Sequence, residues 1–386
     1  GIDAIHGHGL NMDATIFPSQ LAVACSWDRE IVEKMGEVTA REVATDGLHW
    51  TFSPVLCLGR DTRWGRINET FGEDPYLSGE LGAAIIKGYQ GEDLSDGEHI
   101  LACAKHYLGY GEAVGARDAC DSEVTERKIR EVFLPPFQKA VEAGCATIMT
   151  AYGSTDSTPL TASRKIMHDI LRDELGFEGF VITDWDNTMS LMTKQKVAKD
   201  IEDASVQTIN AGNDMIMVTL DFYEAMLSAL KKGTVDISTV DEAVLHILTI
   251  KYEMELFEKP EKTGKADCFS CEEHLAASLD AARKSVTLLR NKDMLPLDKN
   301  CKKIAVIGPN ADDVRAQYGD WTYFTHPQPK PDCVPTRPYV TVKEGVEALC
   351  KENNIEFVYA KGCSVLPSEE DDLDAAIKVA SDADAI

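Results

Sequence analysis

Short apolar runs, rich in β-branched residues, alternate with longer amphipathic stretches through the first two thirds of the chain. The short runs predict strands at residues 2–5, 50–55, 101–107, 147–152, 180–183 and 215–218. The stretches between them predict helices at residues 28–45, 75–90, 125–143, 163–175, 198–210 and 221–232. Asp28 stands where a helix N-cap is expected, and Gly144, Gly176 and Gly233 follow predicted helix ends.

This alternation determines the fold class that we expect. Strands that are apolar throughout, each followed by a helix, are typical of a parallel sheet covered on both faces. Six such units occupy about 220 residues, whereas a closed barrel of eight units needs about 250. We therefore expect an α/β fold that opens with a (β/α)8-type TIM barrel whose N-terminal part is missing.

A second region follows the barrel pattern. It comprises a helix at 239–257, a charged linker at 258–265, a helix at 271–289, a strand from 303, a strand at 355–359 and a helix at 368–380. We expect a partial barrel domain at 1–258, an interdomain linker and helix at 259–301, and a partial second α/β domain at 302–386. Because the chain begins and ends inside predicted strands, we also expect it to be a piece of a longer protein.

Composition narrows the classes of partner. The 386 residues carry 65 acidic and 39 basic side chains, a formal net charge of −26. This charge disfavours nucleic-acid partners, and no apolar run approaches the ~18 residues of a membrane span. A neutral or cationic small-molecule substrate fits best. The eleven cysteines have no regular spacing, which favours reduced thiols and a cytoplasmic location, while a periplasmic or secreted location stays open.

Polar residues at the carboxyl ends of barrel strands are the first candidates for chemistry, because ligands bind there. Asp184 follows the strand at 180–183, where it is either a catalytic carboxylate or a helix N-cap. Lys105 lies in an apolar strand, so we expect either a functional role or an ion pair with a neighbouring-strand carboxylate. His6 and His8 have the spacing of a metal-binding pair, but loop histidines bonded to the backbone are the simpler interpretation.

Several motifs then follow one another in a characteristic order. They are GIDAIHGH at 1–8, DTRWGR at 61–66, GEDPY at 72–76, KH at 105–106, GFVITDW at 179–185, VTLLRN at 286–291, LPL at 295–297 and IAVIGPNA at 304–311. Together they resemble glycoside hydrolase family 3 over essentially the whole chain. The resemblance implies a retaining, exo-acting β-glycosidase in which a TIM barrel precedes an α/β sandwich domain, whose C-terminal part is missing here.

The resemblance also implies roles for individual residues. Asp184 matches the catalytic nucleophile, and we expect nearby Arg66 and Lys105 to favour its ionised form. The side chains implied to surround the terminal sugar are those of Asp3, Arg66, Lys105, His106, Met149, Tyr152 and Trp185. We expect the acid/base glutamate beyond Ile386 and assign none within the chain. Neither a cofactor nor a metal is implied.

The sugar class follows from two further features. Members of the family that remove N-acetylglucosamine carry a Pro-Gly-His-Gly loop after the Lys-His pair, and this chain lacks it. The loop GARD at 115–118 is instead similar to the β-glucosidase and β-xylosidase group. Asp3, as an acceptor for the C6 hydroxyl, favours terminal β-D-glucosyl residues of β-glucosides or β-glucan oligosaccharides, with a β-xylosidase as the alternative.

Hypotheses from other classes stay open at this point. A metal-dependent amidohydrolase would use His6, His8 and further residues at strand ends as ligands. A sugar-binding pseudoenzyme would bind a monosaccharide without turnover. Schiff-base chemistry at Lys105 would require a carbonyl substrate. The sequence also leaves a homodimer open.

Overall fold

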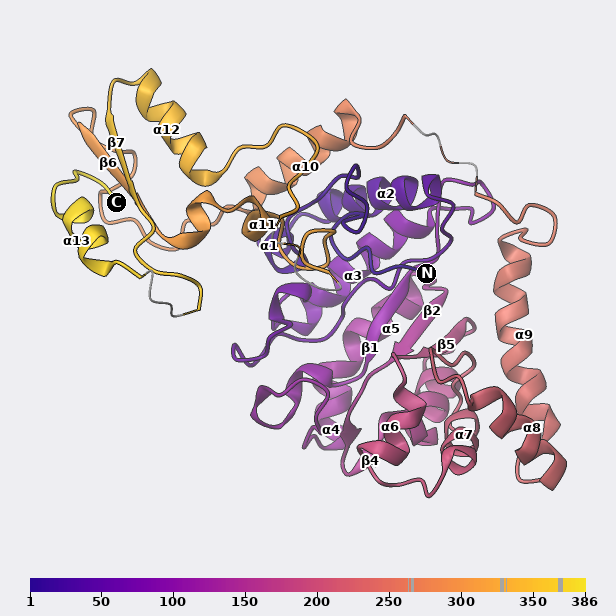
Figure 1. The fold of residues 1–386 in the computed structure, drawn as a ribbon. Coiled ribbons are helices and arrows are strands. Elements are labelled where there is room, and N and C mark those ends of the chain that lie inside the picture. The colour runs from indigo at the N-terminus through magenta and orange to yellow at the C-terminus, as the bar shows by residue number, and fades with distance from the viewer. Residues whose placement is uncertain (263, 265–266, 327–329, 331, 367–370) are drawn as a thin grey trace. The chain divides into compact units, whose positions relative to one another are not determined.

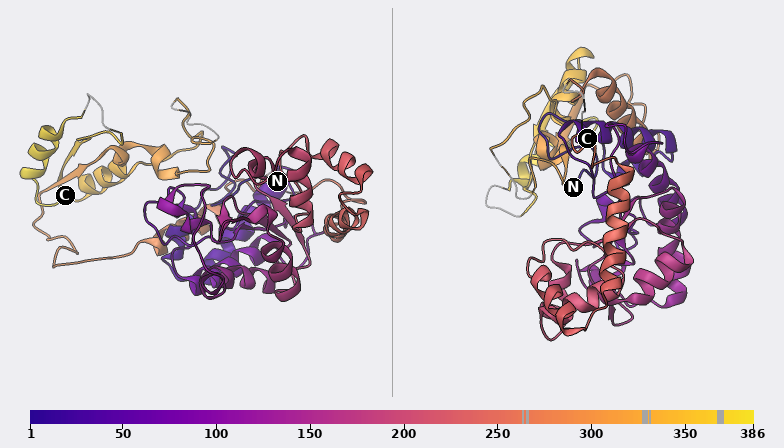
Figure 2. Two further views of the ribbon diagram at one scale, coloured as in Figure 1. Left: turned by 90° about the horizontal axis from the view of Figure 1, so that it is seen from below. Right: turned by 90° about the vertical axis from the view of Figure 1, so that its right-hand side faces the viewer.

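The computed structural model describes residues 1–262, 264, 267–326, 330, 332–366 and 371–386. The chain divides into two compact units, unit 1 with residues 1–9 and 14–286, and unit 2 with residues 10–13 and 287–386. Figures 1 and 2 show the elements of both units. The domain boundaries predicted after residues 258 and 301 stay a prediction.

Three parallel strands form the regular centre of unit 1. They are β1 (Cys103–Tyr107), β2 (Thr147–Thr150) and β5 (Phe180–Thr183), paired in the order β1-β2-β5. Every residue of the three strands is buried, as a sheet covered on both faces requires. The predicted strand at 180–183 is confirmed with its bounds, and those at 101–107 and 147–152 are confirmed in shortened form.

The strands predicted at 2–5, 50–55 and 215–218 are wrong as regular strands. These segments run parallel to their neighbours and are joined by the isolated bridges Ile2↔Thr51, Trp50↔Leu101, Val55↔Lys105 and Ile182↔Met215. Side-chain hydroxyls replace ladder carbonyls: Thr51 Oγ1 accepts from Ala4 N at 3.3 Å, and Thr183 Oγ1 accepts from Met217 N at 2.9 Å. The six parallel segments still follow one another in chain order, which is the order of a barrel, and the predicted fold class is confirmed.

Most predicted helices of unit 1 are confirmed to within a few residues. They are α2 (Arg29–Thr45), α3 (Pro75–Gln90), α7 (Ile201–Asn210), α8 (Phe222–Lys232), α9 (Ile237–Glu253) and α10 (Glu272–Ser285). Asp28 caps α2 by accepting from Glu30 N and Ile31 N, and Asp74 caps α3. The two helices pack side by side on the outside of the strands (Figure 1).

Two predicted helices depart from α-helical geometry. The stretch predicted at 125–143 consists of α4 (Glu126–Lys128), a π-helical turn (Ile129–Phe133) and α5 (Leu134–Glu142). Pro135 and Pro136 follow the π turn and have no N–H to donate to it, which accounts for the altered hydrogen bonding. The helix predicted at 163–175 is a π-helix, Lys165–Glu174.

Shorter elements complete unit 1. They are α1 (Gln20–Ala24), α6 (Asn187–Thr193), the hairpin strands β3 (Ser154–Thr155) and β4 (Thr158–Pro159), and the 3-10 turns Ile67–Glu69, Tyr110–Glu112, Val114–Ala116 and Leu160–Ala162. Cys103, Met149 and Ile182, one from each regular strand, pack together in the barrel core. Within the described residues, no helix is both long enough and apolar enough to cross a bilayer.

Unit 2 is built on two parallel strands, β6 (Lys303–Ile307) and β7 (Glu356–Ala360), with Ala385 bridged to Ile304. Its helical elements are a 3-10 turn (Pro309–Asp312), α11 (Val314–Tyr318), α12 (Val342–Glu352) and α13 (Leu373–Ser381). The predicted α/β pattern is therefore confirmed. Residues 368–370 of the predicted last helix, and residues 263 and 265 of the predicted linker, lie outside the described residues.

Candidate active site

Asp184 occupies the carboxyl end of β5. The residue is only 9 % exposed, and its Oδ1 accepts a hydrogen bond from Trp185 N at 2.6 Å. Its Oδ2 is buried and has no hydrogen-bond partner within the described part of the chain. The alternative role as a helix cap is wrong, because Asp186, not Asp184, holds the N-cap position of α6. A buried carboxylate oxygen without a donor is expensive in a folded protein, which marks Asp184 as a candidate functional group.

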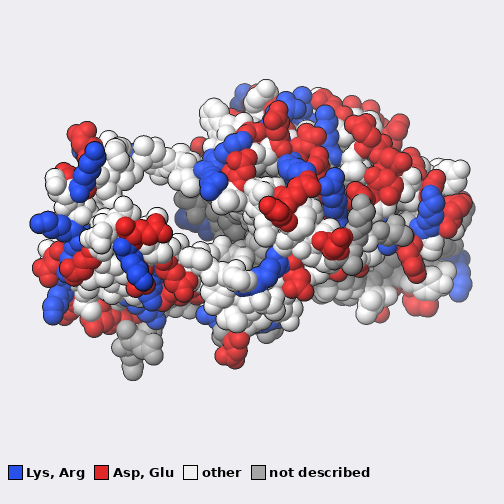
Figure 3. Space-filling view, turned by 90° about the horizontal axis from the view of Figure 1, so that it is seen from above, with Lys and Arg blue, Asp and Glu red and all other residues white. Residues whose placement is uncertain are grey.

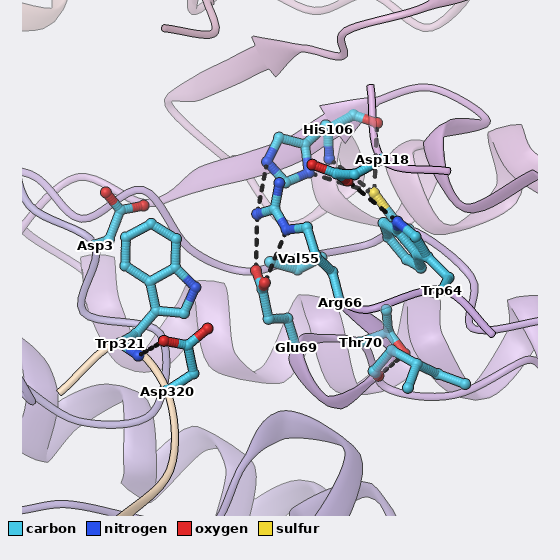
Figure 4. Close-up of polar contacts among 12 residues, drawn as sticks. Asp3, Val55, Trp64, Arg66, Glu69, Thr70, His106, Asp118, Asp320 and Trp321 are labelled. Atoms are coloured by element: carbon cyan, nitrogen blue, oxygen red, sulfur yellow. Dashed lines mark hydrogen bonds and ion pairs between the residues drawn. The ribbon is translucent and has the colours of Figure 1, made fainter. Parts of the chain in front are cut away.

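His106 and Arg66 lie beside this carboxylate. His106 Nε2 is 3.6 Å from Asp184 Oδ2. Arg66 places one guanidinium nitrogen 3.3 Å from the same Nε2 (Figure 4). The pKa of His106 is well below 6.5, first because the ring is buried and then because Arg66 and Lys105 are positively charged. His106 is therefore neutral at physiological pH.

Lys105 and Asp3 form the second charged group of the site. Lys105 is 2 % exposed, and its Nζ lies 2.6 Å from Asp3 Oδ1. The expected ion pair of Lys105 forms, but its carboxylate is not on a neighbouring strand, because the segment 50–55 runs between the segment of Asp3 and β1. The pair still leaves a charged donor and a charged acceptor together at the barrel end, so it is compatible with binding several hydroxyl groups.

The protonation of Asp184 is set by opposing effects. Burial is the largest and raises its pKa, while the Trp185 N–H, the charges of Lys105 and Arg66, and the Tyr152 hydroxyl lower it. The two cations act in the direction that the sequence predicts, but burial outweighs them. Asp184 therefore ionises at higher pH than an ordinary aspartate.

The remaining predicted residues have different surroundings. The Tyr152 hydroxyl donates to Trp185 O at 2.8 Å, which joins the two aromatic residues. Trp185 is 63 % exposed and can present its ring to a ligand, whereas Met149 is 2 % exposed in the barrel core. Asp3 thus contacts Lys105, and Arg66 and Asp184 both lie beside His106, the residue that follows Lys105 in β1. The roles of these five predicted residues stay predictions.

The structure adds residues that the sequence analysis does not identify. Glu69 is 4 % exposed and binds Arg66 through two hydrogen bonds of 2.8 Å each. Asp118 accepts from Trp64 Nε1 at 3.2 Å (Figure 4). It also accepts from Tyr110 Oη at 2.7 Å, and the Tyr110 ring packs against His106. Cys57 contacts His106. Only Glu69 has a local signal, since it lies three residues after Arg66, a spacing that brings side chains together on a helical turn.

The suggested metal ligands are not brought together. His6 Nδ1 is bonded to Phe17 O at 2.8 Å, as the simpler interpretation predicts, and His8 Nε2 is bonded to Asp46 at 2.6 Å. Among the described residues, the side chains close enough to share one ion are those of His168, Asp169 and Asp173. His6 and His8 are not in that group, which removes the basis of the amidohydrolase hypothesis.

Two family descriptions match most of the chain. The description "Glycosyl hydrolase family 3 N terminal domain" matches residues 1–250, and "Glycosyl hydrolase family 3 C-terminal domain" matches residues 286–386. A β-xylosidase of Formosa agariphila is 34 % identical over 403 residues, covering 100 % of this chain and 55 % of that protein.

Solved structures are similar over nearly the whole chain. A β-glucosidase involved in saponin metabolism from intestinal bacteria matches with a TM-score of 0.89 and 43 % identity, over 95 % of this chain and 49 % of that one. The Listeria innocua β-glucosidase in complex with glucose matches with a TM-score of 0.85 and 33 % identity, over 99 % and 51 %. The chain spans about half the length of the proteins it matches.

Proposed function

The chain belongs to glycosyl hydrolase family 3, and on that premise we propose that the protein is a retaining, exo-acting β-glycosidase. It removes terminal non-reducing β-D-glucosyl residues from β-glucosides or β-glucan oligosaccharides. The observation that carries the proposal is the buried carboxylate of Asp184, whose Oδ2 lies beside His106 and has no hydrogen-bond partner among the residues that the structure describes.

Asp184 is the nucleophile of this proposal. Its Oδ2 attacks the anomeric carbon, the aglycone oxygen leaves, and a covalent glycosyl–aspartate ester forms, which water then hydrolyses. A second carboxylate about 5–5.5 Å away serves as acid and then as base in such enzymes. Asp3, Glu69 and Asp118 are already bonded to Lys105, Arg66 and Tyr110, so we assign none of them to that role.

The charged groups beside Asp184 suit a sugar. A pyranose offers hydroxyl groups that both donate and accept, and Asp3, Lys105 and His106 supply acceptors and a charged donor within one buried region. Tyr152 and Trp185 provide apolar ring faces at its edge. Met149 supports the strand beneath rather than a sugar face, because its side chain is buried in the core.

Glucose is the favoured sugar, and xylose is the second candidate. The Asp3 carboxylate is 25 % exposed, so it is accessible to the C6 hydroxymethyl group that glucose has and xylose lacks. The solved relatives named above are β-glucosidases, which supports the first choice. The Formosa agariphila relative is a β-xylosidase, which supports the second.

Hydrolysis of dinitrophenyl β-D-glucoside and of the matching β-D-xyloside tests the proposal, since this leaving group needs no acid catalyst. We expect the larger kcat/KM for the glucoside, and proton NMR should show the β-anomer of glucose as the first product. Inversion to the α-anomer would contradict the mechanism. A larger kcat/KM for the xyloside would favour the second candidate, and sugar binding without release of dinitrophenol would indicate a pseudoenzyme.

A further inference from the structure

Cys57 contacts His106 at three points. The His106 backbone N–H donates to Cys57 Sγ at 3.2 Å, the Cys57 S–H donates to the His106 carbonyl at 3.7 Å, and Sγ lies 3.5 Å from ring Nδ1. Cys57 is 3 % exposed, and burial raises the pKa of its thiol to about 12. The thiol therefore keeps its proton and serves as a weak neutral partner for the histidine ring.

The contacts of the ring identify which nitrogen carries its proton. Arg66 lies 3.3 Å from His106 Nε2, and a guanidinium group can only donate, so Nε2 must accept. The ring is neutral and has one proton, which must then lie on Nδ1, facing Cys57 Sγ. This leaves the Nε2 lone pair, and not an N–H, on the side of Asp184.

The opposite tautomer would change the state of the nucleophile. Asp184 Oδ2 lies 3.6 Å from Nε2 and has no hydrogen-bond partner within the described residues. With the proton on Nε2, a small movement would bring an N–H to this oxygen, forming a hydrogen bond to a carboxylate. Such a bond lowers the pKa of a carboxylate and makes its oxygen a weaker nucleophile.

We propose that Cys57 is a positioning residue that holds the ring proton of His106 on Nδ1 and so keeps Asp184 Oδ2 free for attack. The inference rests on the proposed function, because it takes Asp184 to be the nucleophile. Cys57 touches neither Asp184 nor the space in front of it; it acts through His106. His106 then offers Nε2 as an acceptor for a sugar hydroxyl, once Arg66 shares its donors with the ligand.

Several charged or titratable groups surround His106 and Asp184. His106 faces Cys57, Arg66, Tyr110 and Asp184, and Asp184 also faces Lys105 and Tyr152. Arg66 stays charged because, although burial opposes it, its hydrogen bonds with Glu69 raise its pKa. Tyr110 and Tyr152 stay neutral because burial raises the pKa of both. Asp184 is therefore the group that titrates at acid pH.

Ring nitrogen NMR tests the tautomer without depending on catalysis. In protein labelled with nitrogen-15 histidine, with His106 assigned by comparison with His106→Gln, we expect Nδ1 protonated and Nε2 unprotonated. In Cys57→Ala the Nδ1–H loses its acceptor, and Arg66, whose same nitrogen also donates to Glu69 at 2.8 Å, can release Nε2, so the Nε2–H form should appear. The hydroxyl of Cys57→Ser should preserve the original form. A protonated Nε2 in the unaltered protein, or the same tautomer in Cys57→Ala, would overturn the proposal.

The rate of covalent labelling by an activated 2-deoxy-2-fluoro-β-glucoside tests the consequence for Asp184. In Cys57→Ala we expect the plateau rate constant to fall about tenfold and its acid limb to move to lower pH by about one unit. The matched control is Cys145→Ala, a buried thiol bonded to Thr147 O at 3.2 Å, which should label as the unaltered protein does.

The two measurements separate the possible failures. An unchanged plateau and limb in Cys57→Ala would overturn the positioning role. Loss of labelling in both Cys57→Ala and Cys57→Ser would also overturn it, because a structural requirement for the thiol would explain both. Absence of labelling in the unaltered protein would count against the proposed function, and the NMR result would still decide the tautomer.

Discussion

Asp184 combines two features that make a buried charge destabilising: its carboxylate is desolvated, and one oxygen has no hydrogen-bond donor in the described part of the chain. Its pKa is raised in the folded protein, so the folded state binds more protons than the unfolded state as the pH rises through that range. Stability therefore falls as pH rises through the folded pKa.

We expect Asp184→Asn to stabilise unit 1 at pH 7 by about 1 kcal/mol, the lower end of the cost of an unsatisfied buried polar group. The gain should shrink toward acid pH, where the carboxyl group of the unaltered protein is neutral. Urea unfolding followed by tryptophan fluorescence at several pH values measures both effects. A variant that is less stable at pH 7 would show that the carboxylate is satisfied in solution.

Glu69 determines whether Arg66 can remain buried. The side chains are 4 % and 19 % exposed, and removal of one partner leaves an uncompensated charge. We expect Glu69→Gln to lower the free energy of unfolding by about 3 kcal/mol and to raise KM for a glucoside more than it lowers kcat. Denaturant unfolding and steady-state kinetics test the two parts.

The matched control is Asp61→Asn, which breaks a second carboxylate–arginine pair nearby in the sequence. Arg63 binds Asp61 through two hydrogen bonds, but the pair is on the surface, with side chains 72 % and 31 % exposed. Asp61→Asn should therefore change the free energy of unfolding little. Equal losses in the two variants would mean that the Arg66–Glu69 pair is not energetically buried.

Among single residues, the sequence predicts those site residues that lie at the end of a strand. Asp184, Lys105 and His106 come directly at or after buried strands, and barrel geometry brings such positions together. Cys57 and Asp118 have no such signal. Their importance arises from contacts with His106 and Tyr110, which only the folded chain reveals.

Among the elements, the N-terminal end of α10 is held in place by one buried carboxylate, that of Glu42. Glu42 of α2 is fully buried; its Oε1 accepts from His274 Nδ1 at 2.8 Å and from Ser270 N at 2.9 Å, and its Oε2 accepts from Thr15 N at 2.6 Å. Ser270 and His274 belong to the start of α10 and the turn before it. The carboxylate thus fixes the N-terminal end of α10 to α2.

We expect Glu42→Gln to cost about 3 kcal/mol, because an amide cannot accept from donors on both sides. Amide hydrogen exchange in α10 should accelerate before exchange in β1 or β5. The control is Glu273→Gln. Glu273 lies in α10 and forms an exposed ion pair with Lys34 of α2, so its loss should leave amide exchange in α10 almost unchanged. Equal exchange in α10 for both variants would contradict the anchoring role.

Helices are predicted better than strands, for a physical reason. Caps such as Asp28 and Asp74 are local, and their hydrogen bonds form as expected. A regular strand, in contrast, needs a neighbouring segment that offers backbone hydrogen bonds in register. Here the hydroxyls of Thr51 and Thr183 accept from backbone N–H groups instead, and Pro54 has no N–H to donate. Three segments with strand composition are therefore joined only by isolated bridges.

For the whole molecule, the order of motifs carries more information than composition does. The net charge of −26 excludes little by itself, although on the face shown in Figure 3 Lys and Arg lie among Asp and Glu rather than in one basic surface. The absence of a nucleic-acid partner stays a prediction on that basis. The ordered set of motifs predicts the family, and matches over residues 1–250 and 286–386 confirm it.

The most direct test of the account is to find where a trapped sugar is attached. We would treat the protein with a 2-deoxy-2-fluoro-β-D-glucoside that carries a good leaving group, digest it, and locate the added mass by tandem mass spectrometry. The account predicts a fluoroglucosyl ester on Asp184, and no ester in Asp184→Asn. An ester on another carboxylate of the unaltered protein would contradict the assignment of the nucleophile.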